Sequence, residues 1–325
     1  MNILIFIAPF LLATINRTAT RRMNEQPIRL EIDKGKNVSR MPEWIRQQLG
    51  GGLDYGRTSK AVHGNHLHTV CEEARCPNRG ECWSRGTATM MLLGDTCTRA
   101  CGFCAVKTGK PAALNTGEPQ QVAAAIKAMD LNYVVLTSVN RDDLADGGAG
   151  IFADTYTYIK EYNRDTGIEF LTPDFQQGQQ RAIEIIMAAV TKFNDASDKP
   201  ALVWGHNVET VPRLYKKARK GSKYQRSLDL LALASRQPGV ETKSAIMLGL
   251  GETHDEIIEV LGDLRSVGVS RIAIGQYLRP TISHLPVESY IHPTEFTALQ
   301  QQAEQLGFGW VKAGPLVRSS YHADD

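Results

Sequence analysis

CEEARCPNRGEC (residues 71–82) and CTRACGFC (residues 97–104) together contain all six cysteines of this 325-residue chain. The cysteines form two triplets of different spacing. The first triplet is Cys71, Cys76 and Cys82, and the second is Cys97, Cys101 and Cys104. A thiolate is a soft ligand that selects iron–sulfur clusters, zinc or copper. The clustering therefore predicts metal chemistry between residues 71 and 104.

The second triplet is suited to a cluster with one open iron. Three cysteines on a short loop can ligate three of the four irons of a [4Fe–4S] cluster, and the fourth iron is then able to bind a substrate. Gly102 lets the backbone bend closely around such a cluster, and Phe103 is placed to shield it from water. We therefore interpret this loop as the centre of a catalytic site.

Two other interpretations of the cysteines stay open on spacing alone. Disulfide frameworks are typical of small secreted chains, whereas this long chain keeps its cysteines in one region. Structural zinc usually takes four ligands, and His63, His66 and His68 just upstream are able to complete a mixed thiolate–imidazole site. A zinc-stabilised binding module without catalytic activity is the matching alternative function.

The composition is ordinary for a globular protein. Hydrophobic residues make up 42% of the chain and charged residues 22%, and the formal net charge is +2. No global basic field therefore argues for nucleic-acid binding. Thiols gathered in one region indicate a reducing compartment, so we expect the protein in the cytoplasm.

Residues 1–22 differ from the rest of the chain. The apolar run Ile3–Ala13 is interrupted by Pro9 and is shorter than the ~20 residues that a membrane-spanning helix needs. The arginines follow this run, whereas a signal peptide has its positive charge before it. We expect a disordered upstream extension, and a membrane-associating segment is the alternative.

From residue 87 onward, apolar runs of strand length alternate with segments of helical period. The predicted strands are Ala88–Leu93, Tyr133–Leu136, Ile168–Leu171, Ala201–Trp204, Ser244–Leu248 and Arg271–Ile274. The predicted helices are Pro119–Met129, Ile151–Tyr162, Gln180–Val190, Tyr224–Ser235, Asp255–Val267 and Pro293–Leu306. Alternating units with buried strands imply an α/β fold with a parallel sheet and right-handed crossovers. Six units fit a partial (β/α)6 TIM-like barrel better than a complete eight-stranded one.

This pattern divides the chain into four parts. After the upstream extension, residues 23–86 form a polar N-terminal extension that carries the first cysteine triplet, with a short helix expected at Pro42–Leu49. Residues 87–290 form the partial barrel. Residues 291–325 add a C-terminal helix and a tail.

Polar residues follow the predicted strands at the carboxyl end of the barrel, where barrel enzymes have their active sites. The candidate ligand-binding residues after the second and fourth strands are Thr137, Ser138, Asn140, Arg141, Asn207 and Glu209. Asp142 and Asp143 are either ligands or caps of the next turn. Lys243, near a strand end, is either a ligand for a carboxylate or a surface pairing partner.

The second triplet, CxxxCxxC, resembles the cluster loop of radical S-adenosylmethionine (SAM) enzymes. Together with the first triplet and RSSY at residues 318–321, it resembles the lipoyl synthase family. The resemblance also includes TSVNRDDLADGG (137–148), LTPDF (171–175), HNVETVPRLY (206–215), MLGLGET (247–253) and GQYLRP (275–280). The double triplet with RSSY is highly specific, whereas a CxxxCxxC loop alone is only moderately so. The nearest alternative is another sulfur-inserting radical SAM enzyme, similar to biotin synthase.

This resemblance implies two [4Fe–4S] clusters and SAM as cofactors. The second triplet would hold the cluster that binds SAM, and the candidate residues at the strand ends would contact SAM. The first triplet would hold an auxiliary cluster that supplies sulfur. Ser320 would be the fourth ligand of that cluster, with Ser319 as the alternative, and Arg318 would stabilise the serine oxygen by a charge-assisted hydrogen bond.

The implied reaction inserts two sulfur atoms, at C6 and C8 of an octanoyl group attached to a lysine of a lipoyl carrier domain. It uses 5′-deoxyadenosyl radicals from SAM. The implied partners are 2-oxoacid dehydrogenase acyltransferase subunits, the glycine cleavage H protein, and an electron donor such as ferredoxin or flavodoxin, without nucleic acid or membrane. The basic run from Arg213 to Arg226 is either a docking face for acidic carrier domains or a solvated helix face.

Overall fold

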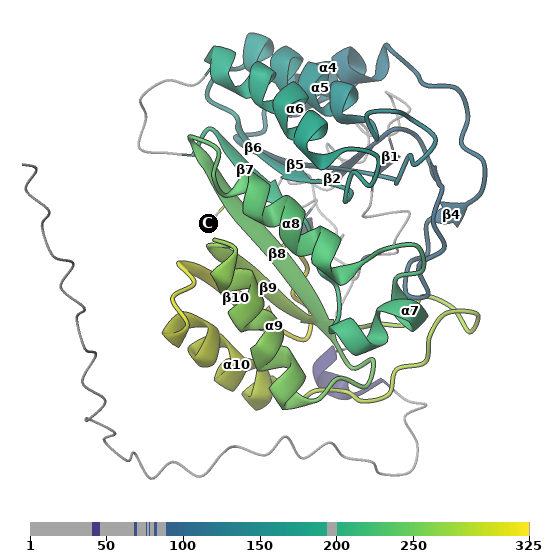
Figure 1. Ribbon diagram of the computed structural model, residues 1–325, viewed down its shortest axis with the longest axis vertical. Coiled ribbons are helices and arrows are strands. Elements are labelled where there is room, and N and C mark those ends of the chain that lie inside the picture. Colours follow the sequence, from purple (N-terminus) through teal and green to yellow (C-terminus); the bar gives the residue numbers. More distant parts are fainter. Residues whose placement is uncertain are drawn as a thin grey trace, which may run out of the picture. The chain divides into compact units, whose positions relative to one another are not determined.

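The computed structural model describes residues 41–45, 68–69, 76, 78, 81–82, 89–193 and 200–324 (Figure 1). The predictions for residues 1–22, Cys71, His63 and His66 lie outside these residues, as does the second half of the expected N-terminal helix. The first half of that helix is a 3-10 turn, η1 (Glu43–Ile45). Within the described ranges, no helix has the length and apolar character needed to cross a membrane.

An eight-stranded sheet forms the centre of the described structure, in the order β1-β2-β5-β6-β7-β8-β9-β10. Neighbouring strands are parallel except for β1, which is antiparallel to β2. The strands are β1 (His68–Thr69), β2 (Thr89–Leu92), β5 (Tyr133–Ser138), β6 (Gly167–Leu171), β7 (Leu202–Gly205), β8 (Val240–Leu248), β9 (Arg271–Gln276) and β10 (Trp310–Gly314). A second, two-stranded sheet joins β3 (Thr96–Cys97) to β4 (Lys107–Thr108).

Each of the strands β2, β5, β6, β7, β8 and β9 is followed by a helix that returns the chain to the next strand. The helices are α4 (Glu118–Met129), α5 (Ala149–Tyr162), α6 (Gln179–Phe193), α8 (Tyr224–Ala234), α9 (His254–Ser266) and α10 (Pro293–Gln305). Two short turns, η2 (Pro212–Leu214) and α7 (Tyr215–Ala218), precede α8. In Figure 1 the helices follow the sheet from α4–α6 at the top to α10 at the bottom. The predicted succession of six β/α units is confirmed.

Strand β10 lies in the part of the chain that we predicted to be only a helix and a tail. It pairs in parallel with β9, and Trp310 is opposite Arg271. The segment WVKAG is short and has a lysine at its centre, so its apolar periodicity is too weak to predict a strand. Strands β1 and β10 are the two edges, and no pairing between described residues closes the sheet. The barrel is therefore partial, with one more parallel strand than predicted.

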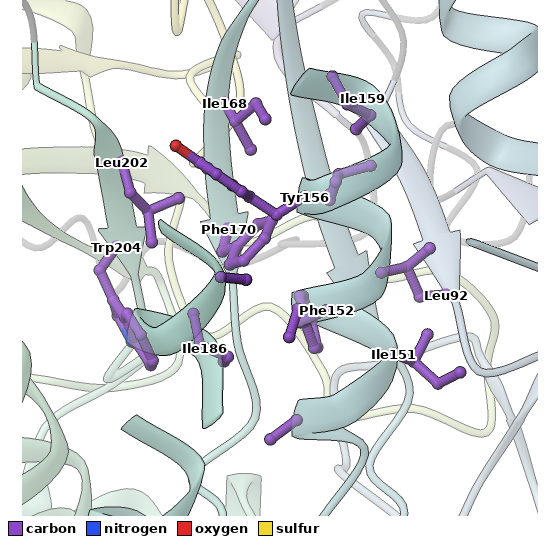
Figure 2. Packing of buried hydrophobic residues seen from close by; sticks show 14 of the residues in the cluster. Leu92, Ile151, Phe152, Tyr156, Ile159, Ile168, Phe170, Ile186, Leu202 and Trp204 are labelled. Atoms are coloured by element: carbon purple, nitrogen blue, oxygen red, sulfur yellow. The ribbon is translucent and has the colours of Figure 1, made fainter. Parts of the chain in front are cut away.

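The core that supports the sheet lies between the strands and the helices. Apolar side chains of α4, α5 and α6 pack against β2, β5, β6 and β7. Figure 2 shows Phe152 and Tyr156 of α5 beside Phe170 of β6. The ring centroids of Phe152 and Phe170 are 4.9 Å apart in an edge-to-face arrangement, which aromatic pairs favour. A second cluster joins α8, α9 and α10 to β8 and β9, so both halves of the sheet have a packed outer face.

The opposite face of the sheet carries polar residues. Phe170 faces the helices, so its neighbour Glu169 points to the other side of β6. The carboxylate of Glu169 lies 2.8 Å from the ammonium of Lys243 on β8, and both side chains are buried. The same ammonium lies 4.5 Å from the ring centroid of Trp310 on β10. The prediction of a surface pairing partner is thus wrong, because Lys243 connects three strands inside the barrel.

Candidate functional site

The second cysteine triplet lies on the loop that follows β2, at the carboxyl end of the parallel strands. Cys97, Cys101 and Cys104 are half-buried thiols. The loop is closed by backbone hydrogen bonds from Cys104 N to Cys101 O at 3.2 Å and from Gly109 N to Cys97 O at 3.0 Å. Burial, together with the neighbouring thiols, raises the pKa of Cys101 to about 12 and that of Cys104 to about 11. The structure therefore brings these three predicted ligands together in a poorly solvated loop.

Arg99, within the same loop, connects the triplet to the segments that follow β5 and β6. Its guanidinium is buried and donates to Asp142 from Nε and Nη2, both at 2.7 Å. It also donates to Asp174, from Nη1 at 2.9 Å and from Nη2 at 2.7 Å. Burial lowers the pKa of Arg99, but the hydrogen bonds to the two carboxylates more than offset this effect and raise it. The arginine is therefore charged, and it clamps the loop between two acids.

The sequence did not single out Arg99, and it left Asp142 as either a ligand or a turn cap. The structure gives Asp142 a different role, because its carboxylate holds the cysteine loop. The sequence signal for this contact is limited to the charged residues themselves, Arg99 in CTRAC, Asp142 in NRDD and Asp174 in LTPDF. Only the fold shows that they meet. Removing one partner of a buried charge pair typically costs about 3–5 kcal/mol, so this network is a strong constraint on the loop.

Three of the predicted residues lie at the carboxyl end of β5 or directly after it. Thr137 donates its hydroxyl to the backbone carbonyl of Leu171 at 2.8 Å. The hydroxyl of Ser138 is buried and has no hydrogen-bond partner in the described part of the chain. The backbone amide of Asn140 donates to the sulfur of Cys97 at 3.4 Å. Amide bonds to sulfur of this kind tune the potential of an iron–sulfur cluster.

Arg141 faces a different region. Its guanidinium pairs with Asp143 at 2.9 Å, and this hydrogen bond lowers the pKa of Asp143. It also donates to the backbone carbonyl of Ala112. It lines a cavity of about 240 Å³ beside the first turn of α4, where Glu118 accepts a hydrogen bond from the backbone of Leu93. No described cysteine lines this cavity, but Thr96, the neighbour of Cys97, does.

Asn207 and Glu209 follow β7 and lie at the centre of the barrel mouth. The side-chain nitrogen of Asn207 donates to Oε1 of Glu209 at 3.2 Å. The side-chain oxygen of Asn207 is buried without a partner among the described residues. Glu209 has a left-handed backbone, with φ 68°, a conformation that typically costs about 1–3 kcal/mol. Its amide and carbonyl both bond to β8, which maintains this conformation. Burial raises the pKa of Glu209.

Two arginines approach Glu209, and each is close to one cysteine triplet. Arg219 is buried at the end of α7. Its positive charge lowers the pKa of both Glu209 and Cys101, whereas burial raises them. The positive charge of Arg318, on the C-terminal tail, also lowers the pKa of Glu209. Arg318 is close enough to Cys76 to interact with it electrostatically. Glu209 therefore lies between a cation beside the second triplet and a cation beside the first. Sequence reasoning proposed Glu209 but missed Arg219.

The C-terminal tail is attached to the first triplet. The side-chain amide of Asn78 donates to the backbone carbonyl of Leu316 at 2.5 Å. The hydroxyl of Tyr321 donates to the carboxylate of Glu81 at 3.1 Å, and a ring nitrogen of His322 lies 3.3 Å from the same carboxylate. Asn78 and Glu81 both lie within the CEEARCPNRGEC segment. The tail and the first triplet therefore form one unit.

The tail reaches this position by crossing the carboxyl end of β9. A side chain at Gly275 would collide with the carbonyl oxygen of Val317, so only glycine admits the tail here. Cys76 and Cys82 are half-buried beside the tail, and Cys71 lies outside the described residues. The structure thus places the RSSY segment over the barrel mouth and next to the described part of the first triplet.

Ser319 and Ser320 are half-buried on this tail. Ser320 makes no hydrogen bond with another described residue. Arg318 donates from Nη1 to the carbonyl of Val317 at 2.6 Å. The hydrogen bond expected between Arg318 and the serine oxygen stays a prediction.

Comparison with known proteins identifies this arrangement. The model of the radical SAM superfamily matches residues 91–264, and the model of the N-terminal domain of lipoyl synthase matches residues 9–76. The lipoyl synthase of Acidovorax ebreus (strain TPSY) is 49% identical over 94% of this chain and 90% of its own length. This chain belongs to the lipoyl synthase family. The lipoyl synthase of Symbiobacterium thermophilum is 50% identical over 89% of this chain and 87% of its own length.

Membership of the lipoyl synthase family decides between the alternatives left open by the cysteine spacing. The chain is an enzyme, and the non-catalytic zinc module and the biotin-synthase-like function are set aside. The radical SAM family implies SAM and an iron–sulfur cluster as cofactors. Streptococcus suis SuiB bound to S-adenosylmethionine shares the fold, with a TM-score of 0.52 over 74% of this chain and 55% of that chain at 10% identity.

The donor set of this lipoyl synthase family member is compatible with such a cluster. The described residues contain no group of three or more His, Cys, Asp or Glu side chains placed to bind a metal ion. A [4Fe–4S] cluster sets a different requirement, because each thiolate ligates a different iron. The buried, unpartnered oxygens of Ser138 and Asn207 fit a polar ligand such as SAM at the barrel mouth.

Proposed function

We propose that this enzyme inserts two sulfur atoms, at C6 and C8 of an octanoyl group attached to a lysine of a lipoyl carrier domain. The observation that carries the proposal is that Glu209 interacts with two arginines, of which one also interacts with Cys101 and the other with Cys76. Arg219 from the side of the second triplet and Arg318 from the side of the first both act on this carboxylate. A substrate chain that enters this space is close to both sets of thiols, as a reaction with a separate radical source and sulfur source requires.

Two [4Fe–4S] clusters and SAM are the proposed cofactors. The ligands of the SAM-binding cluster are Cys97, Cys101 and Cys104, and those of the auxiliary cluster are Cys71, Cys76, Cys82 and Ser320. When bound, these groups supply a 5′-deoxyadenosyl radical for hydrogen abstraction and sulfide for the new carbon–sulfur bonds. The protein binds and orients them. A hard serine oxygen is a weaker partner for iron than a thiolate, which suits an iron that is released once sulfide is taken.

The residues at the barrel mouth are proposed to bind SAM. The unpartnered oxygens of Ser138 and Asn207 are available to its polar groups, and Glu209 is able to accept hydrogen bonds from its ribose hydroxyls. Thr137 and the backbone of Asn140 complete the wall beside the cysteine loop.

Two other residues hold and cover this site. Arg141, which pairs with Asp143, positions the segment after β5 from behind. The tail from Val317 onward covers the mouth and excludes water from the site.

The proposed protein partners follow from this reaction. The substrate is an octanoylated lipoyl carrier domain, either of a 2-oxoacid dehydrogenase acyltransferase subunit or of the glycine cleavage H protein. A ferredoxin or a flavodoxin supplies electrons. Reduced thiols are required as ligands, so we place the protein in the cytoplasm, where glutathione and thioredoxin keep thiols reduced.

The four-part division of the chain also stays a proposal. In this division the barrel is formed by residues 87–290, and the auxiliary site is formed by two extensions, residues 23–86 and 291–325. We expect residues 1–22, which lie outside the described residues, to contribute nothing to activity. A protein that begins at Met23 should convert the octanoyl substrate at the rate of the full chain. A large loss of activity in an anaerobic assay of this shorter protein would show that the upstream residues contribute to the site.

Anaerobic turnover of an octanoyl-lysyl peptide with SAM and dithionite tests the proposed function. Mass spectrometry of the peptide should show addition of two sulfur atoms, and iron analysis should give about eight irons per chain, as two [4Fe–4S] clusters require. Formation of 5′-deoxyadenosine without any sulfur in the peptide, in protein with its full iron content, would overturn the proposal.

A further inference from the structure

The surface around the second cysteine triplet carries many cations, and the acids at its border are Asp95, which pairs with Lys107 at 4.0 Å, and Glu288, which pairs with Lys217 at 3.4 Å. Three segments border the triplet, residues 96–117, 210–228 and 277–287, and none of them contains an aspartate or a glutamate. We call their exposed cations the cationic rim, apart from Arg213, which pairs with Glu256 at 2.7 Å. The rim consists of Lys107, Lys110, Lys216, Lys217, Lys220, Lys223 and Arg279.

The first segment contains the cysteine loop, and the other two are bonded directly to it. The backbone amide of Gly102 donates to the carbonyl of Ala218 at 2.8 Å, which attaches the loop to α7. The amide of Leu285 donates to the carbonyl of Gly102 at 2.9 Å. A ring nitrogen of His284 lies 2.9 Å from the carbonyl oxygen of Cys104. The segments that carry the rim are therefore in direct contact with the loop that holds the predicted cluster ligands.

Arg99 connects the two lysine-bearing parts of the rim. The hydroxyl of Thr108, next to the first rim lysine, donates to the backbone carbonyl of Arg99 at 3.1 Å. The guanidinium of Arg99 donates to Ser222, between the last two rim lysines, at 3.0 Å. Figure 1 shows β4 and α7 at the same side of the molecule. The rim lysines thus flank one short stretch of the cysteine loop.

The structure separates the basic run of residues 213–226 into two kinds of residue. Arg219 is buried beside Glu209, and Arg226 pairs with Asp174 at 3.0 Å, so these arginines belong to the interior. The lysines of the run are exposed, and only Lys217 among them forms an ion pair with a described residue, Glu288, at 3.4 Å. Exposed pairs of this kind contribute about 0–1 kcal/mol and leave the surface strongly positive.

We propose that the cationic rim docks a small acidic electron-transfer protein that supplies the electrons for SAM cleavage. The proposal rests on the proposed function, since each cleaved SAM consumes one electron. The donor is oxidised when it gives up that electron, the bond between C5′ and the sulfonium sulfur of SAM is cleaved reductively, and methionine leaves. The adenosyl fragment becomes 5′-deoxyadenosine by taking a hydrogen atom from the substrate carbon.

Complementary charge suits this kind of partner. Electron-transfer complexes are small and transient, and charge steering raises the association rate by about 10- to 1000-fold. Ile282 stands in the middle of the third segment with 89% of its surface exposed, and it provides an apolar contact inside a polar surround. It lies two residues from His284, whose ring is bonded to the Cys104 carbonyl.

A lipoyl carrier domain is a less suitable occupant of this surface. It presents its octanoyl group on a long lysine arm, so its own surface does not have to approach the cysteine loop. An electron donor does, because the rate of electron transfer falls steeply with the distance between the redox groups. We therefore assign the rim to the donor, and the experiment below includes the carrier as a competing outcome.

The test compares two charge-reversal variants of the holoenzyme. Lys110→Glu with Lys220→Glu alters the rim on both sides of Arg99, and neither lysine is ion-paired to a described residue. Lys192→Glu with Arg236→Glu is the matched control, since it makes the same change in net charge near the amino ends of β7 and β8, at the opposite end of the barrel. Formation of 5′-deoxyadenosine is measured with either dithionite or photoreduced flavodoxin, and with either the octanoyl-lysyl peptide or an octanoylated carrier domain.

The rim variant should lose about tenfold or more of the second-order rate with flavodoxin at low salt, with the loss shrinking at high salt. Its rate with dithionite should equal that of the control on both substrates. Calorimetric titration with oxidised flavodoxin should show a weaker Kd for the rim variant than for the control, and Ile282→Ser should weaken binding by a smaller factor.

An equal loss with both reductants, or no loss with flavodoxin, would overturn the proposal. A loss seen only with the carrier domain, whichever reductant is used, would also overturn it and assign the rim to the carrier. The proposed function has a different test: it is wrong if the unaltered enzyme with dithionite forms no sulfur-containing peptide. The flavodoxin titration reports on the rim in that case as well.

Discussion

The two cysteine triplets are held in different ways. The second triplet lies on a short loop of the barrel, and the buried guanidinium of Arg99 joins that loop to Asp142 and Asp174. The first triplet lies outside the parallel sheet, and its described contacts run from Asn78 and Glu81 to the C-terminal tail. One site is thus built into the barrel, whereas the other is assembled from two distant extensions at its mouth.

This difference agrees with the proposed roles of the two sites. A cluster that generates radicals is used again in every turnover, so its ligands benefit from rigid support in the core. A cluster that donates its sulfide has to be taken apart and rebuilt, so its ligands benefit from weaker and more accessible attachments. Half-buried contacts such as those of Glu81 suit the second task.

Alanine substitution within each triplet should give the largest contrast. Cys101→Ala should abolish SAM cleavage, because the cluster with the open iron fails to assemble. Cys76→Ala should keep reductive cleavage to 5′-deoxyadenosine and form no carbon–sulfur bond. Chromatography of nucleoside and peptide products measures both. A folded Cys76→Ala protein that cleaves no SAM would contradict the division of labour.

Ser320→Cys tests the tail side of the comparison. A fourth thiolate binds iron more firmly than a serine oxygen, so the auxiliary cluster should assemble and then resist giving up its sulfide. The reaction should stop near the first sulfur insertion, with a singly sulfurated peptide as the main product in mass spectra. Lipoyl product formed at the normal rate would remove Ser320 as a ligand, and Ser319→Cys is the matched control.

Arg99→Lys tests the barrel side. A lysine keeps the charge but cannot donate to Asp142 and Asp174 in the same bidentate manner, so the cysteine loop should loosen. We expect a loss of roughly tenfold in SAM cleavage, as about 1.4 kcal/mol of lost positioning would give. The electron paramagnetic resonance signal of the reduced SAM-binding cluster should change, and that of the auxiliary cluster should not. An unchanged signal with normal cleavage would show that the clamp has no influence on the cluster.

Tyr321→Phe should have the smallest effect. It removes the hydroxyl that donates to Glu81 at 3.1 Å and leaves the ring in place. A hydrogen bond to a charged group contributes about 1.5–3 kcal/mol when buried, and this one is only half-buried, so the tail should stay attached in most molecules. Sulfur insertion should slow by a few-fold while SAM cleavage is unchanged. A matching decrease in both rates would mean that the tail supports the whole barrel mouth.

The barrel was largely predictable from sequence, because its signals are local. The strand at Val134–Leu136 is an apolar run bounded by polar residues, and the helix from Glu118 to Met129 has apolar positions on one face. Strand β10 and the turn α7 have no such signal. They form because β9 and the cysteine loop provide partners that are distant in the sequence.

For the candidate site, the sequence allowed us to predict only which kinds of residue act as ligands. The cysteine spacing predicts metal chemistry, the family resemblance carried by the triplets and RSSY implies the two clusters, and the assignment of individual ligands stays a prediction. The clamp was not predictable, because Arg99 is 43 residues from Asp142 and 75 from Asp174 and each residue is unremarkable alone. Lys243 shows the same limit, since its partner Glu169 is 74 residues away on another strand.

The attachment of the tail has a consequence for how the enzyme is made. Asn78 and its partner Leu316 are 238 residues apart in sequence. A ribosome that adds about 5–20 residues per second needs on the order of 10 to 50 s to synthesise that interval. During this time the segment with the first triplet has already left the ribosome without its tail partner. Iron and sulfide delivered to it before the tail arrives would meet an unfinished site, so the auxiliary cluster should be loaded after the barrel has been translated.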